Sequence, residues 1–341
     1  NVEGLPDSLV AMVERKTENI EVKKKKFVYS KNFDKPQWVY LCDLKVIKSG
    51  VFKANRVFAI PGETIEMKGN FTEGVDIKGG KFYQEQELMD EYKGQAHKDI
   101  KALRKWYSDN VNDSNRDSIE KVVDERMEPL QKKYAADLLA YAKQHSGQEC
   151  IALLIDELDD VKDKETLISL MADNVKNGRM KAYYEPIVER AKKRAEMEEK
   201  AKVVQASGVE APDFTLNDIN GKPFSLSSLR GKYVVIDFWG SWCIWCIKGM
   251  PKMKEYYEKY KGKFEILGVD CNDTEAKWKA AVEKHQLPWI HVYNPKGSDV
   301  LGKYAIQGFP TKIVVGPDGK IVKTIVGEDP AFYTLLDEVL K

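Results

Sequence analysis

Two cysteines separated by two residues, Cys243 and Cys246, are the residues whose type and spacing could most directly do chemistry. They lie in "WGSWCIWCIKGMP", directly after a run of strand-forming residues. A sulfur placed at the start of a helix meets free N–H groups and the helix dipole, which favour thiolate over thiol. A second sulfur one turn later can reach back and resolve a mixed disulfide. The spacing therefore favours thiol–disulfide exchange.

Two other uses of the cysteine pair fit the sequence less well. A structural disulfide across two intervening residues closes too short a loop to constrain the unfolded chain much. A zinc site normally needs about four ligands. The histidines lie far away in sequence or inside other expected elements: His97, His145, His285 and His291. We therefore predict a redox pair, with no metal and no other cofactor.

The segments around the cysteines alternate between strand and helix signals. Residues 233–239, "YVVIDFW", form a continuous apolar strand pattern, and residues 247–262 have a helical pattern. Further strands and helices alternate to the end of the chain, which implies a central sheet covered by helices. Small residues and a proline in "QASGVEAPDF" place a boundary near residue 206. We expect an α/β domain over residues 206–341.

The part of the chain before this boundary has two different patterns. Residues 1–90 contain short runs of Val, Ile, Phe and Tyr between Pro-Gly, Gly-Asn and Gly-Gly turn signals, which predicts a small β-domain, either an antiparallel sheet or a sandwich. From about Glu91, apolar residues three and four apart predict a helical segment over residues 91–205. Its last, highly charged stretch is typical of a solvated connecting helix.

The amino-acid composition excludes several classes of protein. With 55 basic and 54 acidic residues, the chain lacks the basic excess of a nucleic-acid-binding protein. No apolar stretch approaches the roughly 20 residues of a membrane span, and no signal peptide is recognisable. A start at Asn is compatible with a mature or trimmed product. The chain has only 5 cysteines, which excludes a dense disulfide scaffold.

From about Val209 onward, the sequence resembles the TlpA/ResA-like branch of the thioredoxin-fold proteins, in the wider group that includes the alkyl hydroperoxide reductases. The resemblance rests on "APDFTLNDINGKPFSLSSLRGKYVVIDFWGSWC", followed by Cys-Ile-Trp-Cys, Pro251 and "GFPT" in this order. It covers roughly the C-terminal 40% of the chain. It implies a mixed sheet flanked by helices, with the dithiol at the start of the first long helix.

The resemblance also implies roles for the residues of the first motif. Cys243 is expected to be the exposed nucleophile, Cys246 the buried resolving thiol, and Trp242 part of the substrate site. Asp237 stands six residues before Cys243 in an apolar strand, where burial raises a carboxyl pKa. In thioredoxins the matching acid helps to deprotonate the resolving cysteine. We therefore expect Asp237 to be the general base for Cys246; the alternative is a buried acid with a backbone or water partner.

The "GFPT" motif implies a substrate groove. Pro310 is the expected cis-proline facing the dithiol, and Phe309 and Thr311 frame the groove. A cis X–Pro bond presents the preceding backbone for strand-like pairing with an extended substrate, and proline removes a donor close to the sulfurs. The alternative is that the motif is only a turn.

Three features depart from the family pattern or lie outside it. Many TlpA-like proteins carry an acidic residue three positions after the second cysteine, where this chain has Gly249, so the base role would fall on Asp237 alone. The dipeptide Ile244-Trp245 is bulky and apolar, unlike the Gly-Pro of thioredoxins, so the direction of electron flow stays open. Cys271 follows an expected strand; a resolving or regulatory role and a partly buried free thiol are both open.

Residues 51–85 resemble a small β-domain that often precedes such thioredoxin domains in bacterial envelope proteins. This resemblance implies the periplasm or cell envelope, and a role for residues 1–205 in partner binding, dimerisation or surface docking. The expected partners are protein thiol or disulfide clients and a redox donor, without nucleic acid. Membrane association through an N-terminal anchor missing from this sequence, and an oligomeric state, are both open.

The sequence thus predicts a thiol-disulfide oxidoreductase, acting as a reductase of protein clients in the cell envelope. A thiol peroxidase is one alternative, because peroxiredoxins share the "APDF…GK" opening. They place a threonine three residues before the peroxidatic cysteine, however, and this chain has Gly240 there. A non-catalytic envelope binding protein with a vestigial redox site is the other alternative.

Overall fold

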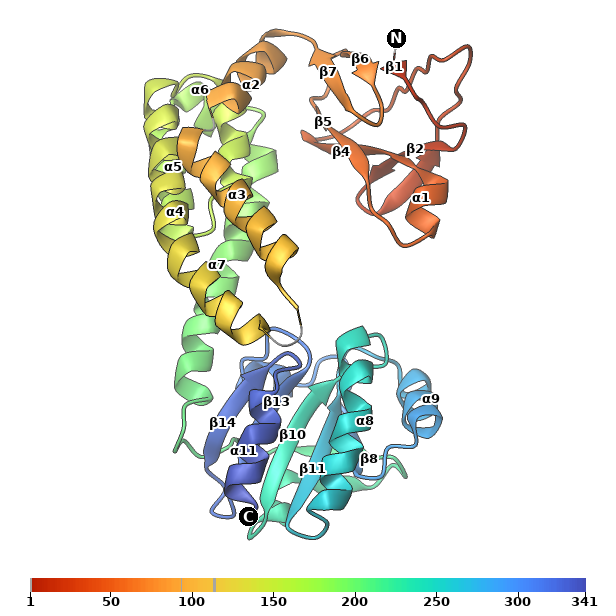
Figure 1. The fold of residues 1–341 in the computed structure, drawn as a ribbon, viewed down its shortest axis with the longest axis vertical. Helices are drawn as coiled ribbons and strands as arrows, with labels where there is room; N and C mark the ends of the chain where they lie inside the picture. Colours follow the sequence, from red (N-terminus) through yellow and green to blue (C-terminus); the bar gives the residue numbers. More distant parts are fainter. Residues whose placement is uncertain (1, 93, 113–114) are drawn as a thin grey trace. The chain divides into compact units, whose positions relative to one another are not determined.

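The computed structural model describes residues 2–92, 94–112 and 115–341 (Figure 1). They form two compact units, one ending at Lys192 and the other comprising Lys193–Lys341. The first unit contains two small sheets and a set of helices, and the second contains one large sheet flanked by helices. Helix α7 (Lys181–Val204) runs through the boundary between the units. The expected domain limits at residues 90 and 205 stay predictions.

The strands of the first unit form two sheets. Among the described residues, one is a four-stranded antiparallel sheet in the order β3-β2-β4-β5, and the other has the order β1-β6-β7. Side chains alternate along β2, so that Leu9, Ala11 and Val13 face one apolar core with Val39 and Leu41 of β4. The β-rich N-terminal region predicted from the sequence is confirmed. Its elements are β1 (Val2–Glu3), β2 (Leu9–Val13), β3 (Lys16–Asn19), β4 (Gln37–Asp43), α1 (Leu44–Lys48), β5 (Ala54–Ala59), β6 (Glu66–Asn70) and β7 (Gly74–Lys78).

Helices follow the last of these strands. The first long helix begins at Lys81, earlier than the change of pattern near Glu91 suggests, because Phe82 and Tyr83 in its first turn are buried. The apolar core of the bundle includes a continuous buried run from Cys150 to Ile155. The helical elements are α2 (Lys81–Tyr92), α3 (Gly94–Asn110), α4 (Arg116–Gln144), η1 (Glu149–Asp156), α5 (Val161–Leu170), α6 (Asp173–Lys176) and α7.

Residues of β4 and β5 also pack against the helical core of the first unit. Phe58 of β5 packs with Phe82 of α2 and Tyr183 of α7, with ring centroids 5.6 and 4.7 Å away. The hydroxyl of Tyr83 donates a hydrogen bond to the carbonyl oxygen of Phe58 at 3.0 Å. Trp38 of β4 donates from Nε1 to the carboxylate of Asp156 at 3.1 Å. The first unit is therefore a single folded body.

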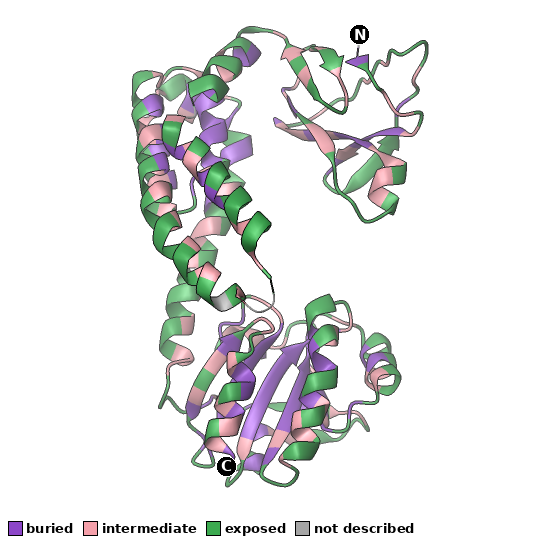
Figure 2. Cartoon of the chain, viewed as in Figure 1, coloured by how far each residue is buried: buried purple, intermediate pink, exposed green. Residues whose placement is uncertain are grey.

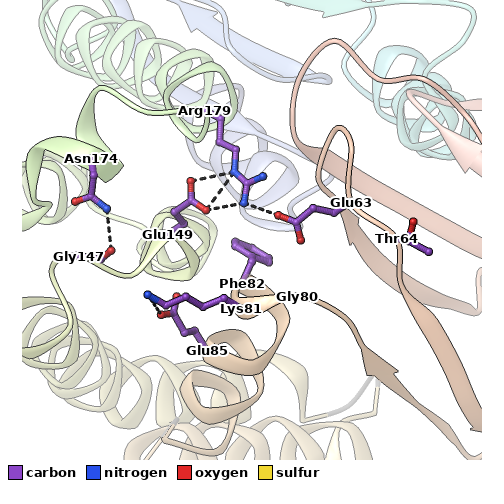
Figure 3. Close-up of a pocket in the computed structure, with 10 residues that line it drawn as sticks. All are labelled: Glu63, Thr64, Gly80, Lys81, Phe82, Glu85, Gly147, Glu149, Asn174 and Arg179. Atoms are coloured by element: carbon purple, nitrogen blue, oxygen red, sulfur yellow. Dashed lines mark hydrogen bonds and ion pairs between the residues drawn. The ribbon is translucent and has the colours of Figure 1, made fainter.

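Arg179, on the surface of the first unit, links the strand region to the helical region (Figure 3). Arg179 donates from Nε and Nη2 to the two carboxylate oxygens of Glu149, at 3.0 and 2.7 Å, and from Nη2 to Glu63 at 2.5 Å. Glu63 lies between β5 and β6, and Glu149 begins η1. The three residues border a cavity of about 490 Å³ lined by Glu63, Thr64, Gly80, Lys81, Phe82, Glu85, Gly147, Glu149, Asn174 and Arg179. Both cations that line the cavity are paired with carboxylates, Arg179 with the two glutamates and Lys81 with Glu85 at 3.5 Å.

Arg179→Ala is expected to lower the stability of the first unit by about 1 kcal/mol, since it breaks a forked contact and leaves two partly buried carboxylates side by side. The midpoint of urea unfolding measures the change. Lys132→Ala is the matched control: it breaks an exposed i,i+4 pair with Glu128 inside α4, worth about 0.5 kcal/mol at most. Equal losses in the two variants would contradict the joining role of Arg179.

The second unit is built around a seven-stranded mixed sheet with the order β14-β13-β10-β11-β12-β8-β9. The central strand β10 runs parallel to β11 and antiparallel to β13. All but the first residue of β10 are buried, as the continuous apolar run "YVVIDFW" predicts, and Figure 2 shows this burial on the strands at the centre of the sheet. The strands are β8 (Thr215–Asp218), β9 (Pro223–Ser225), β10 (Tyr233–Trp239), β11 (Phe264–Asp270), β12 (Ile290–Tyr293), β13 (Thr311–Val315) and β14 (Ile321–Val326).

Helical elements pack against the sheet and form two apolar cores with it. One core takes residues from α8, α9 and α11, and includes both cysteines of the motif. The other takes residues from η2, α10 and the segment that leads into β8. The helical elements are η2 (Leu226–Leu229), α8 (Ile244–Lys259), α9 (Glu275–His285), α10 (Val300–Lys303) and α11 (Ala331–Val339). The turn between β10 and α8 therefore places the two cysteines at the edge of a packed core.

Candidate active site

The cysteine pair lies at the start of helix α8, where the sequence predicts it. Cys243 and Cys246 form a disulfide with an S–S distance of 2.03 Å. Cys243 is the N-cap residue of α8, and its Sγ accepts a hydrogen bond from the backbone N–H of Cys246 at 3.1 Å. A helix N-terminus that donates to sulfur stabilises a thiolate there once the disulfide is reduced.

Both sulfurs are packed against the protein in this disulfide form. Cys243 is 5% exposed and Cys246 is 4% exposed, so Cys243 is not the exposed residue that the resemblance implies. The difference has a physical reason: the bond to Cys246 and the hydrogen bond from its N–H hold Cys243 in the core beneath α8. The exposed apolar surface next to it comes instead from Trp242, Ile244 and Trp245, each more than half exposed.

Trp242 is fixed in place beside the disulfide. Its Nε1 donates to the carbonyl oxygen of Cys271 at 2.9 Å, and its ring meets that of Phe309 edge-on at 5.4 Å between centroids. Gly240 permits this arrangement, because a Cβ atom there would lie 2.5 Å from Nε1 of Trp242 and 2.8 Å from the oxygen of Cys271. The position at which peroxiredoxins carry threonine therefore has no room for a side chain here.

The "GFPT" motif supplies Phe309, whose ring contacts Trp242. The peptide bond between Phe309 and Pro310 is cis, as predicted. Thr311 is buried and donates from Oγ1 to the carbonyl oxygen of Gly308 at 2.8 Å, while the carbonyl oxygen of Pro310 accepts from Gly327 at 2.8 Å. Within the described residues, the backbone N–H and C=O of Phe309 take part in no hydrogen bond. They are available for an added strand.

Asp237 lies in the middle of β10, buried at 5% exposure, and its Oδ1 has no hydrogen-bond partner among the described residues. Burial raises the pKa of this carboxyl to about 6; the charge of Lys312 lowers it and the charge of Glu328 raises it. The sequence reasoning missed Lys312 and Glu328. A lone lysine within the apolar strand "TKIVV" was the available signal for the first.

Two further residues complete the surroundings of the disulfide. Asp273, which the sequence reasoning also missed, accepts hydrogen bonds from the backbone N–H and the hydroxyl of Ser241 at 2.6 and 2.9 Å, and so holds the turn before the cysteines. Cys271 is fully buried, and burial raises the pKa of its thiol. Its Sγ donates to the carbonyl oxygen of Val269 at 3.3 Å.

Residues 207–324 match the AhpC/TSA family. Over 122 residues, the chain is 42% identical to the thiol-disulfide oxidoreductase ResA of a Bacillus cereus strain, covering 36% of this chain and 70% of that protein. The chain belongs to the ResA family of thiol-disulfide oxidoreductases. The ResA of Bacillus subtilis is 33% identical over 123 residues, which cover 36% of this chain and 68% of the relative.

Two solved structures are similar to the C-terminal part of the chain in sequence. The thioredoxin domain of a thiol-disulfide oxidoreductase from Bacteroides vulgatus is 37% identical; the match covers 40% of this chain and 99% of that one, with a TM-score of 0.38. A thiol:disulfide interchange protein from Bacteroides sp. is 38% identical over 40% of this chain and 92% of its own, also with a TM-score of 0.38. The family match and the ResA relatives confirm the predicted thioredoxin fold and redox enzyme class.

Among the described residues, no group of three or more His, Cys, Asp or Glu side chains is arranged to hold a metal ion. No helix in the same part of the chain is both long enough and apolar enough to cross a bilayer.

Proposed function

We propose that this chain reduces disulfide bonds of protein clients through Cys243 and Cys246. The observation that carries the proposal is a disulfide at the N-cap of α8, with its first sulfur bonded to a helix N–H. The exposed side chains of Trp242, Ile244 and Trp245 give an apolar surface next to it for an unfolded or extended client.

The proposed reaction begins with the reduced protein. The Cys243 thiolate attacks one sulfur of a client disulfide, and the other client sulfur leaves as a thiolate that takes up a proton. The client segment then lies along Phe309 and pairs with its free backbone groups. Trp242 borders the segment on one side, and the turn formed by cis-Pro310 and Thr311 borders it on the other. The protein and the client are now joined by a mixed disulfide at Cys243.

Resolution of the mixed disulfide needs a thiolate at Cys246. We assign the removal of its proton to Asp237, a buried carboxylate in the strand that leads to the cysteines. A pKa raised to about 6 by burial leaves this carboxylate ionised at neutral pH and still basic enough to share a proton with a thiol. The Cys246 thiolate then attacks Cys243 and releases the reduced client. A redox donor partner restores the dithiol.

The cell envelope is the proposed place of action. The proposal rests on the resemblance of residues 51–85 to a β-domain that precedes thioredoxin domains in envelope proteins. Residues of β4 and β5 in the first unit pack against its helical core, which suits a rigid docking body for a client, a donor or a second copy.

Cys246→Ala tests the proposed order of events. The variant should attack a disulfide but be unable to release the client, so incubation with insulin should give a covalent adduct that reducing agent removes. Non-reducing gel electrophoresis and mass spectrometry measure the adduct. The double variant Cys243→Ser/Cys246→Ala is the control and should give none. An adduct of equal yield in the double variant, or no adduct in either, would sink the proposed mechanism.

A further inference from the structure

Beneath helix α8, the sheet carries a buried ion pair. Lys312 of β13 is 1% exposed, and its Nζ is paired with Oε1 of Glu328, which follows β14. The Nζ atom also lies 5.5 Å from the centroid of the Phe332 ring. A lysine is almost never buried this fully without a partner, and Glu328 is that partner for Lys312.

The Lys312–Glu328 ion pair lies next to Asp237, the proposed general base. Asp237 and Lys312 are directly paired residues of the antiparallel strands β10 and β13. Directly paired residues place their side chains next to each other on one face of a sheet. Lys312 therefore offers positive charge to Asp237, whereas Glu328 shares that charge and adds a negative one nearby.

Glycine at position 249 makes room for Glu328. A Cβ atom at Gly249 would lie 2.3 Å from Cδ of Glu328, far inside van der Waals contact. Gly249 follows Cys246 by three residues, and both belong to the buried face of α8. The carboxylate of Glu328 thus occupies space beneath α8 about one turn from the resolving sulfur, although it comes from a different element.

We propose that Lys312 and Glu328 are positioning residues that set the pH at which Asp237 accepts the proton of Cys246. This inference rests on the proposed function. In the resolving step, the proton passes from Sγ of Cys246 to a carboxylate oxygen of Asp237, and the Cys246 thiolate bonds to Sγ of Cys243. The bond from Cys243 to the client sulfur breaks, and its electron pair leaves with the client thiolate, which takes up a proton.

Lys312 favours the ionised form of Asp237 and Glu328 opposes it. Other titratable groups lie around Asp237: Cys271 at the end of β11, Tyr333 on α11 and, two strands away in the same row, His291 on β12. Cys246 on α8 belongs to the apolar core that also contains Val235 and Trp239, two residues before and after Asp237 on β10. Burial raises the pKa of Cys271 and of Tyr333, and it lowers the pKa of His291 to about 4. All three are therefore neutral near pH 7, which leaves Lys312 and Glu328 as the charged neighbours.

The test follows the resolving step alone. The reduced full-length protein is mixed with one equivalent of dithiobis(nitrobenzoate), which gives a coloured thiolate when Cys243 attacks and a second when Cys246 resolves the adduct. The rate of the second release is measured against pH. Lys312→Met should move its midpoint upward and Glu328→Gln should move it downward, each by about one pH unit. Gly249→Ala should act like Glu328→Gln, since the new methyl group displaces the carboxylate.

Controls separate this effect from loosened packing. Lys259→Met breaks the Lys259–Asp337 ion pair, which joins α8 to α11 and is partly exposed, and should leave the midpoint unchanged. If Lys312→Met does not fold, two other variants replace it in the test. Lys312→Arg should keep the wild-type midpoint, and Glu328→Gln should lower the midpoint. Shifts of the same sign in Lys312→Met and Glu328→Gln, or no shift in either, would overturn the inference. A wild-type protein without any second release would instead refute the proposed function.

Discussion

Cys243→Ser is expected to abolish disulfide reduction, with a loss of at least about a thousandfold in rate. A serine hydroxyl cannot form the mixed disulfide. It also does not ionise near neutral pH, so the helix N-terminus has no thiolate to stabilise. No cysteine outside the Cys243–Cys246 pair can replace it. Cys42, Cys150 and Cys271 are all buried, and burial raises the pKa of each thiol, that of Cys150 to about 12.

Insulin reduction by the purified full-length chain, in the presence of excess dithiothreitol, measures this loss. Cys271→Ser is the matched control, because a serine there can keep the hydrogen bond that Cys271 donates to the carbonyl oxygen of Val269. It should retain the wild-type rate. If Cys243→Ser reduced insulin as fast as the wild type does, the chemistry would have to lie outside the Cys243–Cys246 pair.

The parts of this site that the sequence could predict are those with local signals. The apolar run of β10 predicts a buried strand, and Cys-x-x-Cys after it predicts a helix N-terminus; both depend on residues within one short stretch. These two features follow from side-chain periodicity and helix-end preferences, which neighbouring residues largely determine. The cis bond before Pro310 is expected from the resemblance of the "GFPT" motif to its family.

The parts that were missed depend on pairing between distant strands. Asp237 and Lys312 are adjacent only because β10 and β13 pair in one particular register, and periodicity does not specify which strands pair. Glu328 reaches the space next to Gly249 because β14 follows β13 across the sheet. The burial of Cys243 depends on how α8 packs against the sheet, which the motif itself does not specify.

A second buried carboxylate on the same sheet has an even less favourable environment. Asp270 ends β11, is fully buried, and neither of its carboxylate oxygens has a hydrogen-bond partner in the described part of the chain. Burial, reinforced by the nearby charge of Asp273, raises the pKa of Asp270 to about 8. At neutral pH the folded protein therefore holds a protonated carboxyl that the unfolded chain would ionise.

Asp270→Asn is accordingly expected to stabilise the protein at neutral pH, by about 4 kcal/mol at pH 7. The sign follows from proton binding. A carboxyl whose pKa is raised from 3.8 to about 8 binds more protons in the folded state, so wild-type stability falls as pH rises between these values. Asparagine does not titrate, so the variant avoids this loss. Its advantage should be absent below about pH 4, grow through neutral pH and level off above about pH 8.

Urea unfolding followed by tryptophan fluorescence at several pH values measures the effect, since five of the 7 tryptophans lie in the second unit: Trp239, Trp242, Trp245, Trp278 and Trp289. Asp237→Asn provides an internal comparison. The pKa of Asp237 is raised only to about 6, so the gain in that variant should level off at a lower pH and be smaller. A gain in Asp270→Asn that is the same at pH 4 and pH 8 would mean that asparagine improves packing and that Asp270 carries no proton-linked cost. A loss of stability at every pH would mean that the carboxyl is better accommodated than its buried, unpartnered oxygens indicate.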